Sequence, residues 1–465
     1  MKKVLYVSII ALLLNPVFQF AFASGVVQNG TGGWKAGTAR VLITPEKSMW
    51  MAGYAARNHP SEGVLHDLWA KALAIEDSRG YKAVLVTTDI VGYPKYISDR
   101  IRNRIGAKYG LTRSQIILNG SHTHSGPVMY NAGPSSYPLD QEQLSKVRDY
   151  SARFEDQIVE LVGRAIGSMV PADIYSQNGI VRFQVNRRNN VEASSNRIND
   201  LKGPNDYAVP VIKVENKAGE LMAVAFGYAC HATVLSIYQF SGDYPGFAQI
   251  EFEKSHPGVT AMFFQGAGAD QNPLPRRTIP LAQQYGRELA AAVERVLNED
   301  MVKLDPHLST AYSEINLQFA GPPPSKEELI KIIQDSSSSS YPAYLKLTAK
   351  GLLEKLERGE SLMTSYPYPC AVWKIGAQPV MILGGELLIE YAIELKKKFG
   401  SDIFVIGYSN DVMSYIPSET VLKEGGYEGT RSPIFTTPWH MNIQSSILDE
   451  MVRLAEKAGV QRVKE

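Results

Sequence analysis

The chain has 465 residues, 48 basic and 47 acidic side chains, and a formal net charge of +1. This balance argues against nucleic acid as the partner, because proteins that bind nucleic acid present strongly basic surfaces. The chain has only two cysteines, Cys230 and Cys370, so we expect a large core rather than disulfide bonds to stabilise the fold. One disulfide bond and two unpaired buried thiols are equally compatible with the sequence.

The first residues have the pattern of a secretory signal peptide. A basic start is followed by an apolar run over residues 4–14 and by the small-x-small motif Ala21-Phe22-Ala23. This order predicts a signal peptide over residues 1–23, cleaved before Ser24, and a secreted or periplasmic protein. Asn15-Pro16 interrupts the apolar run, which is therefore too short for a membrane span. An uncleaved anchor is the alternative.

Apolar runs typical of strands alternate with helical patterns over the rest of the chain. We expect strands at residues 39–43, 68–75, 83–88, 209–214, 222–229, 259–264, 371–375, 380–383 and 403–407. We expect helices at residues 97–109, 141–168, 281–297, 326–334, 387–399 and 441–458. The sequence Asn216-Lys217-Ala218-Gly219 predicts a hairpin turn, and Ser325 with Glu328 predicts a capping box.

Five consecutive serines, residues 336–340, interrupt this pattern and predict a low-complexity surface excursion over residues 335–345. We find no internal repeat. The elements together predict an α/β fold, in which residues 24–465 form one large domain with mixed β-sheets flanked by helices.

Two histidines one residue apart, His122 and His124, follow an apolar run. If the strand continues through them, both side chains lie on the same face. Neutral imidazole is the commonest protein ligand for zinc, so the pair can supply one metal ligand and one proton carrier. The bland alternative is a pair of ordinary polar residues at the end of a strand.

Two further polar residues follow expected strands. His231 comes directly after Cys230, so their side chains point to opposite faces and Cys230 is expected in the core. Glu386 follows an apolar strand and two glycines, which allow close backbone approach. A carboxylate there is either a metal ligand or a cap of the next helix, where the macrodipole favours an acid.

The segment over residues 265–273 carries Asp270 and Asn272. It is not a dinucleotide-binding motif, because Gln271 stands where the third glycine is required. Asp270 and Asn272 are suited to hydrogen bonding with a substrate or a metal-bound water, and an Asx-type turn is the alternative. Asp89 and Asp243 are candidates for orienting the ligating imidazoles, or are turn residues.

Six separated motifs, in this combination, resemble the catalytic domain of the neutral/alkaline, non-lysosomal ceramidases. The motifs are His122-Thr123-His124-Ser125-Gly126-Pro127, Asn186-Arg187, the His231 segment, Glu386, Tyr415 and Tyr427-Glu428-Gly429. The resemblance extends from about Trp34 to the C-terminus. It implies a hydrolase in which Zn²⁺ activates a water that cleaves the N-acyl bond of ceramide, giving sphingosine and a fatty acid.

The resemblance also implies roles for individual residues. Four residues match the family's zinc ligands: His122, His231, Glu386 and Tyr415. Three match other active-site residues: His124 beside the metal, Arg187 as an active-site arginine, and Tyr427 as a tyrosine facing the scissile amide. Two imidazoles and a carboxylate leave zinc able to hold a water and lower its pKa towards ~7.

The chain departs from the family pattern in two places. Asn272 stands where the family has a serine proposed to take part in catalysis, and asparagine cannot serve as a nucleophile. The chain also ends near Glu465, which leaves no room for the family's C-terminal immunoglobulin-like domain, so we expect membrane-lipid capture to be weaker or absent. Both departures leave the predicted metal ligands intact, and they affect which substrate the protein is expected to cleave.

The leading hypothesis is a secreted, zinc-dependent amidohydrolase that cleaves a ceramide-like N-acyl bond. One alternative is a zinc-dependent esterase or deacylase that acts on a glycan or another polar acylated substrate. The other is a non-catalytic zinc- or lipid-binding protein. The expected partner is a small-molecule or lipid substrate with an acyl bond, which is compatible with peripheral membrane contact. The sequence does not predict the oligomeric state.

Overall fold

The computed structural model describes residues 32–131, 137–190, 200–335, 343–430 and 437–463, together with Met1 and Glu192. The predicted signal peptide, apart from Met1, lies outside the described residues. The serine run of the predicted surface excursion, residues 336–340, lies outside them as well.

Nine strands of the described chain form a mixed sheet in the order β11-β9-β8-β6-β1-β3-β4-β5, with β13 beside β6. The strands are β1 (Trp34–Leu42), β3 (Trp69–Glu76), β4 (Lys82–Thr88), β5 (Ile116–Gly120), β6 (Val170–Ile180), β8 (Ala208–Asn216), β9 (Leu221–Tyr228), β11 (Thr260–Gln265) and β13 (Val302–Lys303). The pairs β4–β5 and β9–β11 are parallel and the other pairs are antiparallel. The strand β6 was not predicted, because its sequence is too polar to give a clear apolar run.

A second sheet packs face to face with the first. It consists of β14 (Leu308–Gln318), β15 (Ser365–Ile375), β16 (Gln378–Leu383) and β18 (Phe404–Ile406), in that order. Leu85 and Phe264 of the first sheet lie in one buried cluster with Trp373, Val380 and Ile406 of the second. This cluster is the central layer of the core, where both sheets bury an apolar face.

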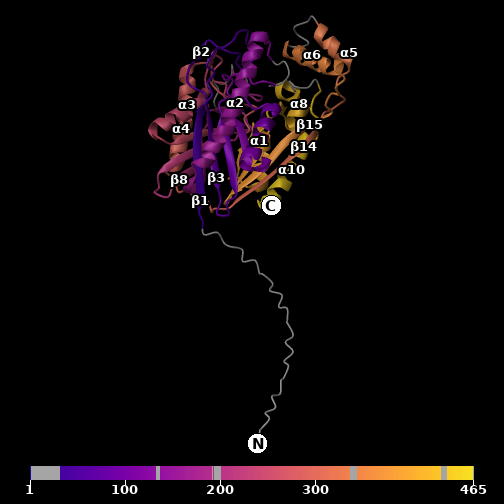
Figure 1. Ribbon diagram of the computed structural model, residues 1–465. Helices are drawn as coiled ribbons and strands as arrows, with labels where there is room; N and C mark the ends of the chain where they lie inside the picture. Colours follow the sequence, from indigo (N-terminus) through magenta and orange to yellow (C-terminus); the bar gives the residue numbers. More distant parts are fainter. Residues whose placement is uncertain are drawn as a thin grey trace. The chain divides into compact units, whose positions relative to one another are not determined.

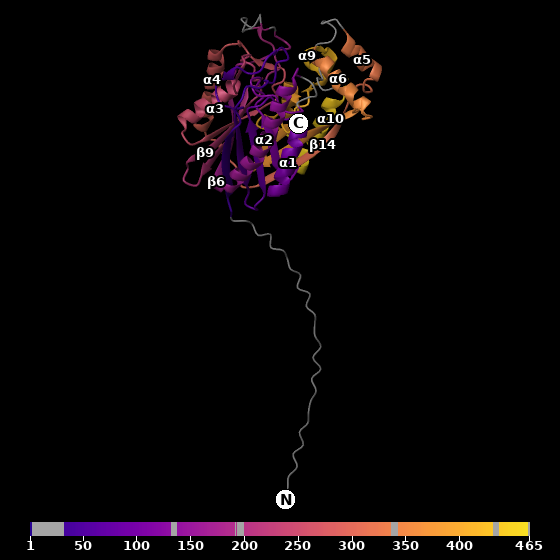
Figure 2. The ribbon, with the colours of Figure 1, turned by 45° about the horizontal axis from the view of Figure 1, so that its top comes forward.

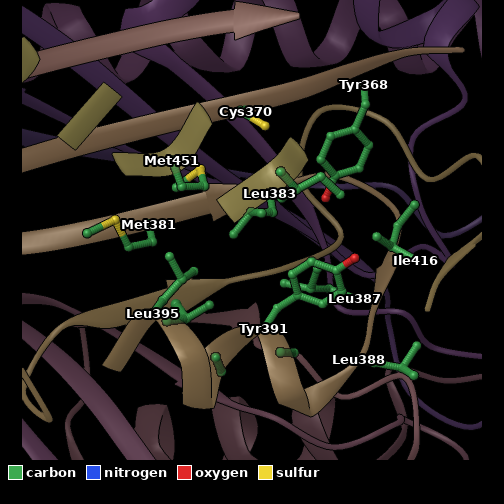
Figure 3. Packing of buried hydrophobic residues seen from close by; sticks show 14 of the residues in the cluster. Tyr368, Cys370, Met381, Leu383, Leu387, Leu388, Tyr391, Leu395, Ile416 and Met451 are labelled. Carbon is green, nitrogen blue, oxygen red and sulfur yellow. The ribbon is translucent and has the colours of Figure 1, made fainter. Parts of the chain in front are cut away.

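Helices cover the outer faces of both sheets (Figure 1). The apolar faces of α1 (Lys95–Tyr109) and α2 (Gln141–Gly167) pack on one half of the first sheet, and those of α3 (Asp243–Ser255) and α4 (Ile279–Leu297) on the other. The second sheet is covered by α7 (Ile389–Phe399) and α10 (Ile443–Lys457). Figure 3 shows Leu395 of α7 and Met451 of α10 against Met381 and Leu383 of β16. The predicted α/β fold, with mixed sheets flanked by helices, is confirmed.

A pair of helices, α5 (Lys326–Gln334) and α6 (Ala343–Glu357), has its own small apolar cluster that includes Leu329, Ile332 and Leu352. The predicted capping box begins α5, since the Ser325 hydroxyl accepts from the Glu328 amide at 3.2 Å and the Glu328 carboxylate accepts from the Ser325 amide at 2.7 Å.

Short elements at the ends of the main strands complete the fold. They are β2 (Gly63–Val64), β7 (Gln184–Asn186), β10 (Gln239–Phe240), β12 (Gln271–Pro273), β17 (Glu386–Leu387), β19 (Tyr415–Ile416), the 3₁₀ helix η1 (Arg113–Gln115), α8 (Glu419–Glu424) and α9 (Gly426–Thr430). The pairs β7–β12 and β17–β19 join segments that are far apart in the sequence.

The two cysteines are free thiols. Cys230 is buried in the cluster beneath α3 and α4, and Cys370 in the cluster beneath α7 and α10 (Figure 3). Of the two alternatives that the sequence allowed, the structure therefore has the unpaired one. No helix in the described ranges has both the length and the apolar character that crossing a bilayer requires.

Candidate metal centre

Three predicted ligands converge on one point. The Nε2 atoms of His122 and His231 each lie 3.4 Å from Oε2 of Glu386. Nε2 of His124 lies 3.1 Å from Nε2 of His122. The ligating atoms of the three histidines are all within 4.8 Å of one another. Side chains separated by more than 250 positions thus form one compact cluster of nitrogen and oxygen donors.

The cluster forms at the ends of β5, β9 and β16. β5 ends at Gly120, and His122 has φ of +58°, so the strand does not continue through the two histidines. The condition under which both side chains would share one face of a strand is therefore not met. A turn brings the two imidazoles together instead, with ring centroids 4.8 Å apart.

Backbone carbonyls fix the orientation of both imidazoles. Nδ1 of His122 lies 2.6 Å from the Val91 carbonyl, and Nδ1 of His231 lies 2.7 Å from the Gly268 carbonyl. Because a carbonyl only accepts, each Nδ1 carries the proton and each Nε2 directs a lone pair to the shared point. Both histidines are therefore held in the tautomer that binds a metal.

Asp89 and Asp243 do not orient these imidazoles, so that suggestion from the sequence was wrong. The Asp89 carboxylate accepts from the Trp69 amide at 2.9 Å. The Asp243 carboxylate accepts from the amides of Val234 and Leu235 at 3.2 and 2.8 Å. Asp243 is the first residue of α3, and its carboxylate fixes the backbone of residues 234 and 235.

The donor set fits a divalent cation. Nε2 of His231 and Oε2 of Glu386 are buried and lack a hydrogen-bond partner among the described atoms. Buried polar atoms without partners are costly, and they point to a missing ion or water. Burial lowers the pKa of His231 to about 4 and that of His124 well below its usual value. Burial raises the pKa of Glu386, but His122 and His231 outweigh it and hold that pKa well below its usual value. His231 and Glu386 therefore favour the neutral and the ionised state, respectively, which are the states in which imidazole and carboxylate groups ligate a metal.

Tyr415 lies next to this cluster. The parallel pairing of β17 with β19 places Tyr415 opposite Glu386, in strands about 4.8 Å apart. Its hydroxyl accepts a hydrogen bond from Nη2 of Arg187 at 3.2 Å. Burial raises the pKa of the Tyr415 hydroxyl well above its usual value. Its role as a fourth ligand stays a prediction.

Arg187 connects the other predicted site residues. Its guanidinium donates to Glu428 at 2.8 Å, to Tyr415 at 3.2 Å and to Asn272 at 3.4 Å. It also lies 5.6 Å from the centre of the Tyr427 ring, which packs edge-on against Tyr415 at 5.4 Å. Burial lowers the pKa of Arg187, but Tyr415 and Glu428 raise it by more than burial lowers it. The net pKa is above the usual value, so the side chain keeps its charge.

Asp270 is tied into the scaffold beneath the cluster. Its Oδ1 accepts from the Ile389 amide, at the start of α7, and its Oδ2 accepts from Asn186, both at 3.0 Å. Its carbonyl accepts from the Arg187 amide at 2.8 Å. Asp270 therefore holds the segments that carry Glu386 and Arg187, and its contact with a substrate or a metal-bound water stays a prediction.

Sequence reasoning missed several residues that pack on the cluster. The Tyr408 ring lies 4.5 Å from that of His122, and the Tyr54 ring lies 4.8 Å from that of His124. No sequence signal separates these two from the other tyrosines. Gly53 has φ of +98°, and a Cβ atom there would lie 2.4 Å from Cγ of His124. No pattern in the sequence indicates this close approach.

Comparisons with known proteins agree with this architecture. Residues 34–273, just over half of the chain, match the family described as neutral/alkaline non-lysosomal ceramidase, N-terminal. Neutral ceramidase A of Dictyostelium discoideum is 26% identical over 272 residues, which are 55% of this chain and 37% of that protein. Neutral ceramidase of Pseudomonas aeruginosa is 25% identical over 260 residues, 52% of this chain and 37% of that protein. The chain thus matches about two fifths of the length of these relatives.

The fold similarity extends over more of the chain. The superposition on the crystal structure of neutral ceramidase from Pseudomonas aeruginosa covers 93% of this chain and 75% of the ceramidase chain. Its TM-score is 0.70 and the sequence identity is 18%. The superposition on a structure of a ceramidase complexed with C2 covers 93% of this chain and 76% of the ceramidase chain. Its TM-score is 0.70 and the sequence identity is 16%. The chain belongs to the neutral/alkaline non-lysosomal ceramidase family.

Proposed function

We propose that the protein is a secreted, zinc-dependent hydrolase that cleaves the amide bond of a ceramide-like N-acyl substrate. The observation that carries this proposal is the convergence of His122, His231 and Glu386, with buried donor atoms that lack partners. Family membership supports the reaction class, and the names of the curated relatives suggest ceramide as the first substrate to test.

His122, His231 and Glu386 would hold the zinc, with Tyr415 beside them. A bound zinc would supply a Lewis acid that lowers the pKa of a water towards ~7. A neutral His124 next to this point is suited to accept a proton and pass it to the leaving amine. This role rests on its position, with Nε2 of His124 3.1 Å from Nε2 of His122.

Arg187 and Tyr427 are suited to bind the carbonyl oxygen of the substrate as charge develops on it. Glu428 and Asn272 hold the Arg187 guanidinium in place. Asn272 occupies the position of the family's serine and contacts Arg187, so its role here is to position the arginine rather than to act as a nucleophile.

The test is the double variant His122→Ala/His231→Ala, with His256→Ala as the control. His256 is paired with Glu294 outside the cluster. We expect the double variant to lose both bound zinc and hydrolysis of a short-chain ceramide, while its circular dichroism stays like that of the wild type. Wild-type activity in the metal-free double variant would remove the proposal.

The same assay separates the alternatives. An esterase or deacylase would release acid from acylated sugars and none from ceramide. The aromatic rings of Tyr54, Tyr408 and Tyr427 around the cluster make that substrate class worth testing. A non-catalytic protein would bind zinc and release no product from either substrate. Secretion is tested by N-terminal sequencing of the exported protein, which we expect to begin at Ser24.

A further inference from the structure

A pocket of about 210 Å³ lies between the start of α1, the end of β14, helix α6 and the loop after β18. We call this cavity the chain pocket. Apolar groups dominate its wall, including Phe319, Leu352, Leu362, Met363 and Met413. Protein cores rarely contain voids larger than a water molecule, and apolar cavities of ~150 Å³ bind benzene-sized molecules. The chain pocket is therefore large enough for an apolar ligand.

Two of the three charged groups in its wall, Lys95 and Asp411, are engaged in other contacts, and the third is Lys355. Lys95 pairs with Asp99 at 3.3 Å and with Glu314 at 3.2 Å. The Asp411 carboxylate accepts from the Tyr366 hydroxyl at 2.6 Å and is almost fully buried. The pocket thus offers its ligand mainly apolar surface, which favours a hydrocarbon group over a sugar or a phosphate.

The loop over residues 408–415 connects the chain pocket with the metal centre. Tyr408, at one end, packs on His122 with ring centroids 4.5 Å apart. Met413 lines the pocket, and it lies two residues before Tyr415, which is at most ~7 Å along an extended chain. A substrate whose reactive bond lies at the metal centre is therefore within reach of the pocket.

Phe319, in another part of the pocket wall, is connected through Trp439 to Tyr415 beside the metal centre. The Phe319 ring, in the wall of the pocket, stacks on Trp439 with centroids 5.1 Å apart. The indole of Trp439 donates to the Tyr415 carbonyl at 2.9 Å. Figures 1 and 2 show α5 and α6 at the end of the body where α8 and α9 lie, and α9 carries Tyr427.

The outer edge of the chain pocket exposes two large apolar side chains. Tyr96 is 44% exposed and Met363 is 45% exposed, and both belong to the wall of the pocket. An apolar rim that continues an apolar pocket marks a binding site for an apolar ligand rather than a packing defect.

We propose that the chain pocket binds one hydrocarbon chain of the amide substrate and sets the chain-length preference of the enzyme. This inference rests on the proposed function. Because burying one methylene contributes ~0.8 kcal/mol, each added carbon raises kcat/KM by about four-fold until the pocket is filled.

The test uses N-acyl amines with chains of two to ten carbons, in two series. One series varies the acyl chain and the other varies the alkyl chain of the amine. The wild type should show a rise of about four-fold per methylene in one of the series. Leu362→Trp should fill the pocket and flatten that rise, and Met363→Asp should weaken it. Hydrolysis of the shortest substrate should be unchanged in both variants.

The control is Ile250→Asp, which alters a side chain of similar exposure on α3, at 42%. It should leave the chain-length profile unchanged. Flat profiles in both series for the wild type, or the same slope in Leu362→Trp and the wild type, would overturn the inference. These outcomes leave the proposed function standing, as long as the shortest amide is hydrolysed.

Binding without turnover tests the pocket independently of the chemistry. Equilibrium dialysis measures the binding of N-dodecanoylethanolamine to the His122→Ala/His231→Ala variant. Binding at least ten-fold weaker after the further change Leu362→Trp supports the chain pocket even if no amide is cleaved. Equal binding by the two proteins refutes it.

Discussion

Replacing Gly53 by alanine tests whether the backbone of the 52–54 segment positions His124. A Cβ atom at Gly53 would lie 2.4 Å from Cγ, 2.6 Å from Cβ and 2.7 Å from Cα of His124. Carbon atoms normally meet at ~3.5–4.0 Å, so His124 must move by about 1 Å. The contact includes the backbone of His124, so a change of rotamer does not relieve it.

The expected loss of activity follows from this displacement. A misplacement of 1 Å in an active site costs about 100-fold in rate, which is ~2.7 kcal/mol of activation free energy. Alanine at φ of +98° also strains the backbone, which lowers the free energy of unfolding by ~1–3 kcal/mol. The zinc content should stay near that of the wild type, because His124 is not one of the predicted ligands.

Gly80→Ala is the matched control. Gly80 has φ of +83° and no atom within 4 Å of an added Cβ, so this variant has the backbone strain without the collision. We expect both variants to lose similar amounts of thermal stability, and only Gly53→Ala to lose activity. The measurements are kcat on a short-chain ceramide, Tm and zinc content. Equal kcat values for the two variants would show that Gly53 does not position His124.

Two further predictions concern ionisable groups near the metal centre. Burial raises the pKa of Asp411 to about 7, so the folded protein binds the extra proton and its free energy of unfolding falls as the pH rises from about 4 to about 7. The fall in the free energy of unfolding is at most ~4 kcal/mol. Urea unfolding should show a smaller difference in this free energy between pH 5 and pH 8 for Asp411→Asn than for the wild type. The same difference in both proteins would contradict the raised pKa of Asp411. Arg187→Lys should lower kcat by roughly 100-fold with zinc retained, because an ammonium cannot contact Glu428, Tyr415 and Asn272 at once. Unchanged kcat and KM on a short-chain ceramide would show that the guanidinium has no role in turnover.

Local patterns in the sequence were sufficient for most of the main elements. The apolar runs of β3, β4, β8, β9 and β11 and the helical periodicity of α2 and α4 are encoded locally, and they match the structure within a few residues. The capping box at Ser325 was also predictable, because its two hydrogen bonds join residues three positions apart. β6 was missed because its neighbours β1 and β8, rather than its own composition, make it a strand.

For the candidate site, too, the sequence predicted one part and the tertiary structure decided the other. The sequence alone supplied the residue types, His122, His231 and Glu386, each directly after an apolar strand. Only the tertiary structure brought their side chains to one point, since this depends on the packing of two sheets. It also decided that carbonyls rather than carboxylates orient the imidazoles.

The sequence by itself thus determined most of the main helices and strands, although not β6, α3 or α6, and which residues have the chemistry of a metal site. The tertiary structure decided the free state of the cysteines, the approach of Gly53 to His124 and the apolar pocket beside α6. The physical reason is that strand and helix patterns depend on residues a few positions apart. Each of the latter features instead depends on contacts between segments that meet only when the sheets and their helices pack together.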